Sequence, residues 1–138
     1  MLLEVLMTET FLAPDTVVLI VEDQPIIAAS LEASLNELGA AEIHIARNLD
    51  LAISLVDRRV PTLAIIDLHW EKEALETFLA RLRALSVGIV LVTDYRVDRD
   101  VAAAGGGEVA IEKPFGDQIL QAAVSKALSM RKSRPSAN

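Results

Sequence analysis

Short hydrophobic runs alternate along the chain with stretches whose apolar residues recur at helical spacing. The run Leu63–Asp67 is the clearest: four apolar residues follow the breaker Pro61-Thr62 and end in a single carboxylate. Periodicity alone does not separate a buried strand from a helix fragment, but the short length and the preceding proline favour a strand. Apolar runs of this kind suit strands covered on both faces. We expect strands over residues 16–21, 42–46, 63–67, 88–92 and 108–111.

Helical patterns separate these runs. Pro25 suits the first turn of a helix, Gly39 suits its end, and Asn48 is placed to cap the next helix. We expect helices over residues 25–38, 49–59, 71–85, 96–104 and 117–130, with Leu85 and Ile119 among the inward-facing residues. The three glycines at 105–107 predict a short, weak helix and a mobile segment there.

Five strands that alternate with five helices predict an α/β fold with a doubly wound parallel sheet. We expect a flavodoxin-like strand order, 2-1-3-4-5, with helices on both faces. One domain over residues 16–131 follows an N-terminal extension, 1–15, and precedes a disordered tail, 132–138. The extension is expected to be a loose arm or a partner-contact segment, and either Met1 or Met7 is compatible with the natural start.

Composition narrows the function classes. The 138 residues are 52% hydrophobic, which is too apolar for a disordered chain. A net charge of -7 argues against nucleic-acid binding, which needs clustered Lys and Arg. There is no Cys, no apolar run long enough to span a bilayer, and no basic segment typical of a signal peptide. A soluble, cytoplasmic protein without membrane contacts is the expectation.

Four of the predicted strands end in residues whose side chains can react or bind ions: Glu22-Asp23, Asp67, Thr93 and Lys113. The carboxyl ends of parallel strands share one sheet edge, so these side chains are expected to converge there. Three neighbouring carboxylates must hold a proton or bind a cation at neutral pH. Their oxygen ligands favour Mg²⁺ over zinc or copper. An Asp carboxylate is also a known phosphoryl acceptor, and the Thr hydroxyl and Lys ammonium would suit the phosphoryl oxygens.

The segments VLIVEDQP, LAIIDL, IVLVTD and IEKPF, in this order and spacing, resemble the receiver domain of response regulators in two-component signalling. The resemblance covers about residues 16–131. It implies that Asp67 accepts a phosphoryl group from a sensor histidine kinase or a histidine phosphotransfer protein. It further implies that Glu22, Asp23 and Asp67 hold Mg²⁺, directly or through water, with the backbone carbonyl of His69 as another ligand.

The resemblance also implies roles at the other strand ends. Lys113 would pair with the phosphate, and a cis peptide bond often precedes the position of Pro114. Thr93 would move toward the phosphoryl group and act as the switch. The family usually has an aromatic residue where this chain has Ala110, so Tyr95 is the substitute switch candidate.

The loop after Asp67 reads Leu-His-Trp-Glu-Lys-Glu and lacks the Met-Pro and Gly usual in the family. Trp70 in this loop would either anchor a partner or cover the edge of the site. These departures support an alternative, a degenerate receiver that binds partners without phosphorylation. A phosphatase with an Asp nucleophile ranks lower, because that chemistry wants a second acid where His69 stands.

Few residues follow the last helix, which predicts a stand-alone receiver that acts through an unknown downstream protein or a phosphorelay. In that case it is a phosphoacceptor, not an enzyme in the ordinary sense. The family places partner contacts on the fourth helix, the fifth strand and the fifth helix. A homodimer is left open.

Overall fold

The computed structural model describes residues 11–94 and 108–133. Tyr95, the expected helix 96–104 and the glycines that follow it lie outside the described residues. Among the residues that are described, no helix combines the length and the hydrophobicity that crossing a bilayer requires.

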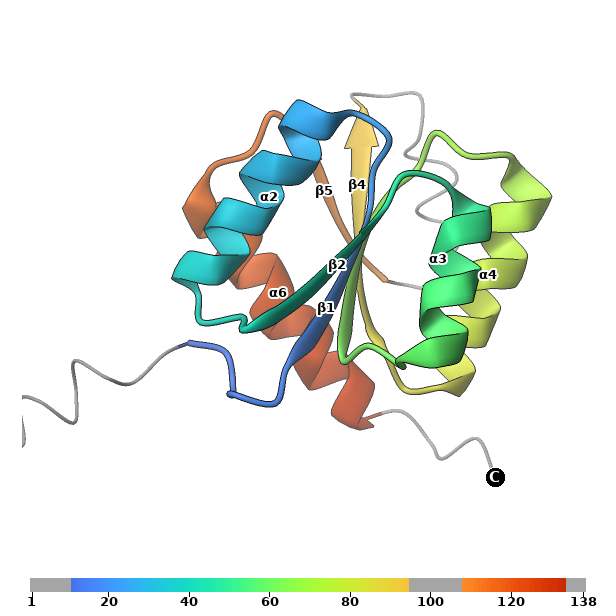
Figure 1. Cartoon of the computed structure of the whole chain (residues 1–138). Helices are drawn as coiled ribbons and strands as arrows, with labels where there is room; N and C mark the ends of the chain where they lie inside the picture. The colour runs from blue at the N-terminus through green and yellow to red at the C-terminus, as the bar shows by residue number, and fades with distance from the viewer. Residues whose placement is uncertain (1–10, 95–107, 134–138) are drawn as a thin grey trace, which may run out of the picture.

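A five-stranded parallel sheet forms the centre of the domain (Figure 1). Its order is β2-β1-β3-β4-β5, so the predicted flavodoxin-like topology is confirmed. The central strands are apolar and buried on both faces, because helices cover the sheet from both sides. The strands are β1 (Val17–Val21), β2 (Glu42–Ala46), β3 (Leu63–Asp67), β4 (Gly88–Asp94) and β5 (Val109–Lys113).

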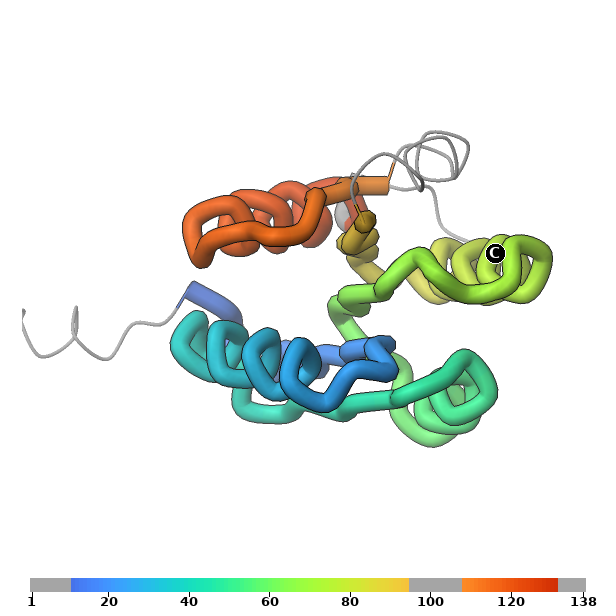
Figure 2. Tube along the Cα trace, turned by 90° about the horizontal axis from the view of Figure 1, so that it is seen from above, coloured from blue at the N-terminus to red at the C-terminus, as the bar shows by residue number. Residues whose placement is uncertain are grey.

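The described helices pack in two pairs against the sheet (Figure 2). They are α2 (Pro25–Glu37), α3 (Leu49–Arg58), α4 (Lys72–Ala84) and α6 (Asp117–Ser133). Alternate residues of each strand supply the two cores. Ile65 of β3 lies in the core beneath α2 and α6, whereas its neighbour Ile66 lies in the core beneath α3 and α4. This packing fixes the strand register and therefore the edge at which each strand ends.

Local sequence signals account for the helix boundaries. The Asn48 side chain accepts a hydrogen bond of 2.8 Å from the backbone N–H of Leu51, as predicted for a cap. Gly39 adopts φ 107° just after α2, a conformation that a side chain would strain. Gly88 allows β4 to approach α6, since an added Cβ would lie 3.0 Å from the carbonyl oxygen of Ala127.

Several boundaries differ from the sequence-based expectation. Leu12 is 1% exposed and its N–H donates to the carbonyl of Leu38 at 2.8 Å, so the end of the N-terminal extension packs with the domain. The helix α6 continues to Ser133, into the expected tail, because nothing in its sequence breaks it earlier. The strands β4 and β5 both extend two residues beyond their expected ends, to Asp94 and Lys113.

The prediction that Ile119 and Leu85 face the core is wrong. Ile119 is 54% exposed and Leu85 is 38% exposed. The buried stripe of α6 consists of Leu120, Ala123, Val124 and Ala127, and small residues there bring the helix close to the sheet. Because this stripe is narrow, Ile119, which precedes Leu120, falls outside it and stays exposed. Leu85 lies just past the last turn of α4, at the helix C-cap.

Candidate functional site

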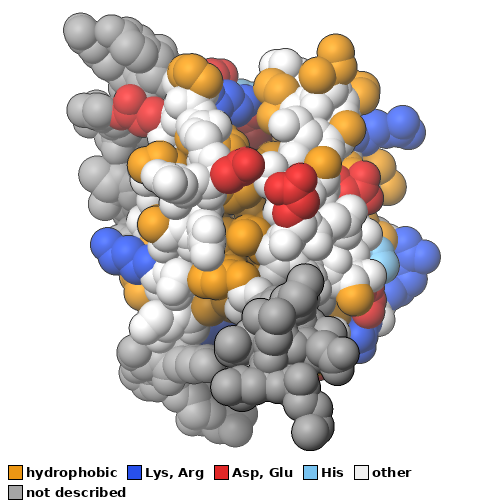
Figure 3. Space-filling model, turned by 90° about the vertical axis from the view of Figure 1, so that its left-hand side faces the viewer, with side chains coloured by type: hydrophobic (Ala, Val, Ile, Leu, Met, Phe, Trp, Pro, Cys, Tyr) orange, Lys and Arg blue, Asp and Glu red, His pale blue; other side chains and the backbone are white. Residues whose placement is uncertain are grey.

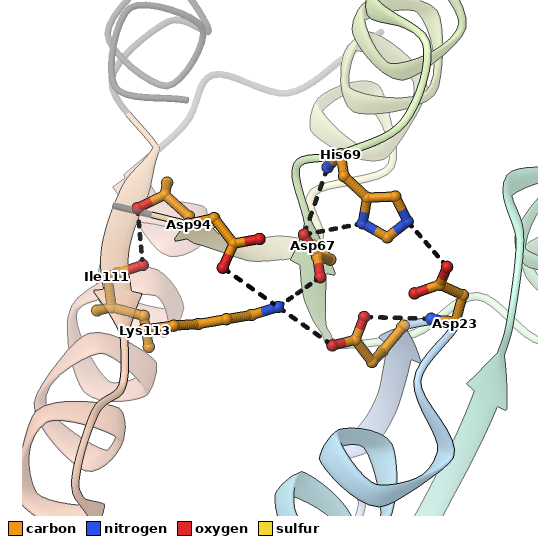
Figure 4. Close-up of polar contacts among 8 residues, drawn as sticks. Asp23, Asp67, His69, Asp94, Ile111 and Lys113 are labelled. Atoms are coloured by element: carbon orange, nitrogen blue, oxygen red, sulfur yellow. Dashed lines mark hydrogen bonds and ion pairs between the residues drawn. The ribbon is translucent and has the colours of Figure 1, made fainter. Parts of the chain in front are cut away.

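The carboxyl edge of the sheet gathers charged side chains from three strands (Figure 4). Glu22 and Asp23 directly follow β1, Asp67 is the last residue of β3, and Lys113 is the last residue of β5. Glu22 is 3% exposed and Asp67 is 2% exposed. Carboxylates this deeply buried need close partners, because desolvation disfavours their charged forms.

Both oxygens of Asp67 have such partners. Oδ2 accepts a hydrogen bond of 2.7 Å from the Lys113 ammonium. Oδ1 accepts a 3.3 Å hydrogen bond from the backbone N–H of His69 and lies 3.1 Å from the Nδ1 atom of the same residue. The side chain of Asp67 is thus held between cationic or donor groups from β5 and from the loop after its own strand.

Lys113 links carboxylates from three strands. Besides Asp67, its Nζ atom lies 3.4 Å from Oε1 of Glu22 and 4.0 Å from Oδ1 of Asp94. Its burial lowers the pKa, but the hydrogen bond and charge of Asp67 outweigh this, so the net shift of the Lys113 pKa is upward. Lys113 therefore stays charged. The following Lys113–Pro114 peptide bond is cis, as the resemblance implied.

Glu22 titrates far from its usual range. Burial first, and then the hydrogen bond and the negative charge of Asp67, raise its pKa to about 7, against a smaller opposing effect of Lys113. Burial also raises the pKa of Asp67, but hydrogen bonds with Glu22, Lys113 and His69 outweigh it, and its net pKa is lowered. In the absence of a bound cation, Glu22 is thus the group that holds the proton near neutral pH, and Asp67 is the carboxylate.

The imidazole of His69 is part of this cluster, which sequence inspection did not foresee. Its Nε2 atom lies 3.2 Å from Oδ2 of Asp23, while Nδ1 contacts Asp67. Burial lowers the pKa of His69, but the neighbouring carboxylates, Asp67 first, raise it above its usual value. The available signal was its position two residues after Asp67, because alternate residues of an extended chain point to the same side.

Thr93 is buried at the end of β4, but its hydroxyl does not join the charged cluster. The Oγ1 atom donates a 3.3 Å hydrogen bond to the carbonyl of Ile111 on β5. The structure therefore brings together Glu22, Asp67, His69 and Lys113, with Asp23 attached through His69. It leaves the Thr93 hydroxyl bonded to the neighbouring strand.

The donor atoms at this edge suit a divalent cation. One ligand atom from each of Glu22, Asp67 and His69 lies within 4.8 Å of the other two. Three carboxylates, from Glu22, Asp23 and Asp67, provide the oxygen ligands that Mg²⁺ prefers. The carboxylate oxygens therefore fit a Mg²⁺ ion, whereas the His69 ring, the third member of this set, offers a nitrogen ligand that Mg²⁺ does not favour.

A family model for the response regulator receiver domain matches residues 18–125. The chain belongs to the response regulator receiver domain family. The match runs from β1 into α6 and includes all the strand ends described above. It supports the terms two-component system and response regulator, and members of this family typically bind Mg²⁺.

Individual relatives agree with this assignment. The chain is 28% identical over 121 residues to the phyllosphere-induced regulator PhyR of Methylorubrum extorquens, covering 86% of this chain and 45% of PhyR. This receiver domain thus spans less than half the length of that curated relative.

Two solved structures are similar as well. One is the signal receiver domain of an HD domain-containing protein from Pseudomonas fluorescens (TM-score 0.73, 28% identity, covering 86% of this chain and 98% of that one). The other is the PhyR stress response regulator (TM-score 0.66, 31% identity, covering 86% of this chain and 47% of that one).

Proposed function

We propose that this receiver domain accepts a phosphoryl group on Asp67 from a phosphohistidine of a sensor histidine kinase or a histidine phosphotransfer protein. One observation supports this above all: a buried Asp67 at the end of β3, with its Oδ2 atom 2.7 Å from the Lys113 ammonium. A lysine pre-positioned on the acceptor carboxylate is ready to neutralise the charge that a phosphoryl group brings.

In the proposed step, a carboxylate oxygen of Asp67 attacks the phosphorus of the donor. The P–N bond to the donor imidazole breaks, its electron pair stays on the imidazole nitrogen, and a P–O bond forms to give an acyl phosphate. Because Lys113 already contacts Asp67, it needs only a small displacement to pair with a phosphoryl oxygen. The domain acts as a phosphoacceptor and contributes positioning and charge neutralisation.

Glu22, Asp23, Asp67 and the backbone carbonyl of His69 are the proposed holders of Mg²⁺. When bound, the ion would neutralise charge on the carboxylates and on the phosphoryl oxygens. Glu22 would lose its proton at this stage, because its pKa is raised chiefly by burial and by the unneutralised charge of Asp67.

Thr93 is the proposed switch residue. Its hydroxyl now donates to the Ile111 carbonyl, and a phosphoryl group on Asp67 would offer it a stronger, charged acceptor. The exchange of one acceptor for the other would loosen the contact between β4 and β5. This is how a local charge change would reach the partner-binding surface around β5 and α6.

The donor protein is expected to contact the groove next to Lys113. A groove of ≈ 330 Å³ lies between α2 and the segment from β5 to α6, and Figure 3 shows the hollow with hydrophobic side chains in it. Ile26 at its rim is 85% exposed, which is unusual for so apolar a side chain. The lining residues include Ile26, Ile27, Leu31, Lys113, Pro114 and Phe115.

The test is phosphorylation with acetyl phosphate and Mg²⁺, followed by the mass of the intact protein. The proposal expects one phosphoryl adduct on the wild-type chain and none on Asp67→Asn. Asp94→Asn is the matched control, because Asp94 also approaches Lys113 but is largely exposed, and this variant should keep the adduct. A wild-type chain without an adduct would favour the degenerate receiver, a phosphorylation-independent interaction module.

A further inference from the structure

His69 places an imidazole between two carboxylates of the proposed metal site. Its Nδ1 atom lies 3.1 Å from Asp67 and its Nε2 atom lies 3.2 Å from Asp23 (Figure 4). These carboxylates come from different strand ends, so the ring bridges the space between β1 and β3. A cation that binds both carboxylates has to occupy this space, either with the ring as a ligand or with the ring displaced.

The identity of the ion decides which of the two occurs. Mg²⁺ is a hard cation that takes carboxylate, carbonyl and water oxygens, and it gains little from an imidazole. Divalent ions of the first transition row bind imidazole well. For Mg²⁺, the ring contacts on Asp67 and Asp23 must be broken and the ring itself gains no bond to the ion. For a transition ion, the same ring supplies a nitrogen ligand that is already close to the carboxylates.

The neighbouring residue holds this ring in place. The indole of Trp70 packs against the core beneath α3 and α4, and its ring centroid lies 4.2 Å from that of His69, with the planes tilted by 33°. Within the described part of the chain, Trp70 Nε1 is buried with no hydrogen-bond partner. Such an orphaned donor is costly, which indicates that the indole is placed for its ring contacts.

We propose that the His69 imidazole is a ligand of the metal site, so that the site selects a nitrogen-binding divalent ion of the first transition row and binds Mg²⁺ only by displacing the ring. This rests on the proposed function, because it concerns the same metal site. It goes further in assigning a ring nitrogen, rather than the backbone oxygen of His69, to the ion. Trp70 is then a positioning residue for that ligand.

Calorimetric titrations of the full chain with CoCl₂ and with MgCl₂ separate these effects by their sign. His69→Ala should weaken Co²⁺ binding by about tenfold or more, since a ligand is lost. The same variant should bind Mg²⁺ as tightly as the wild type or more tightly, since nothing has to be displaced. His69→Gln, which keeps a polar side chain but offers only an oxygen, should behave like His69→Ala toward Co²⁺.

His44→Ala is the matched control. It removes the other imidazole of the chain, which lies on β2 and contacts Glu42 at 2.8 Å, and it should change neither affinity. Pulsed EPR of bound Mn²⁺ adds a direct signature: coupling to ¹⁴N in the wild type and in His44→Ala, and its loss in His69→Ala.

Equal Co²⁺ affinities for the wild type and His69→Ala, or a wild-type spectrum without ¹⁴N coupling, would overturn the proposal. Its failure is distinguishable from a failure of the proposed function. A chain that forms the acyl phosphate but shows no nitrogen coordination loses only the His69 proposal. A chain with nitrogen coordination but no adduct loses only the phosphoacceptor role.

Discussion

Replacement of Glu22 by Gln tests the electrostatics of the site in the metal-free protein. Burial, helped by Asp67, raises the pKa of Glu22 from its ordinary value of 4.5 to about 7. The folded state therefore binds a proton that the unfolded state releases. A group with a raised pKa contributes stability that is fully present below pH 4.5 and is lost as the pH rises through about 7.

The magnitude follows from the two pKa values of Glu22. Each unit of difference corresponds to about 1.4 kcal/mol, so the full effect is about 3 kcal/mol. About 2 to 3 kcal/mol of this falls between pH 5 and pH 8. Glu22→Gln carries a neutral amide of the same shape, which resembles the protonated carboxyl, and it should not lose this contribution.

Urea denaturation in the presence of a chelator, at several pH values from 5 to 8, measures the effect. The free energy of unfolding of Glu22→Gln minus that of the wild type should grow by about 2 to 3 kcal/mol over this range. Most of the contribution of His69 cancels in this difference: burial lowers its pKa, Asp67, Asp23 and Glu22 raise it overall, and both aspartates remain in the variant. A difference that stays constant with pH would refute the assignment of the proton to Glu22.

Three further substitutions test the packing around the site, each by urea denaturation at neutral pH. Leu12→Ala should cost about 2 to 5 kcal/mol, because this side chain is buried in the core; a loss near zero would mean that the segment is a loose arm. Arg83→Ala should cost about 3 kcal/mol, because it leaves the buried Glu108 carboxylate without its bidentate partner at 2.6 and 2.8 Å. Gly88→Ala should cost about 1 to 3 kcal/mol, since its Cβ would crowd the Ala127 carbonyl; unchanged stability would contradict the close approach of α6.

The sheet and the cluster of strand-end residues could be predicted from the sequence because they depend on local, repeated signals. An apolar run that ends in a carboxylate, as at Asp67, predicts both a strand and the edge where its charge lies. The parallel topology then brings Glu22, Asp67 and Lys113 together without further information. Caps such as Asn48 were predictable for the same reason, since the cap bond joins residues close in sequence.

Features that depend on packing between distant segments were not predictable. Leu12 is buried next to the end of α2, where the carbonyl of the C-cap residue Leu38 accepts its N–H. The ring of His69 turns toward Asp23 because β1 ends beside β3, a fact of topology that the loop sequence does not contain. The Thr93 hydroxyl bonds to Ile111 because β5 lies alongside β4, whereas the sequence pattern predicted only that Thr93 would converge with the other strand-end residues.

Reductive trapping of the acyl phosphate identifies the residue that accepts the phosphoryl group. The chain is treated with acetyl phosphate and Mg²⁺, the acyl phosphate is reduced with borohydride, and peptide mass spectrometry locates the reduced residue. We expect Asp67 to be the modified residue and Lys113→Ala to reduce the modification strongly, because Lys113 contacts an oxygen of the acceptor carboxylate. Modification of Asp23 or Asp94 with Asp67 intact, or no modified carboxylate at all, would contradict this expectation.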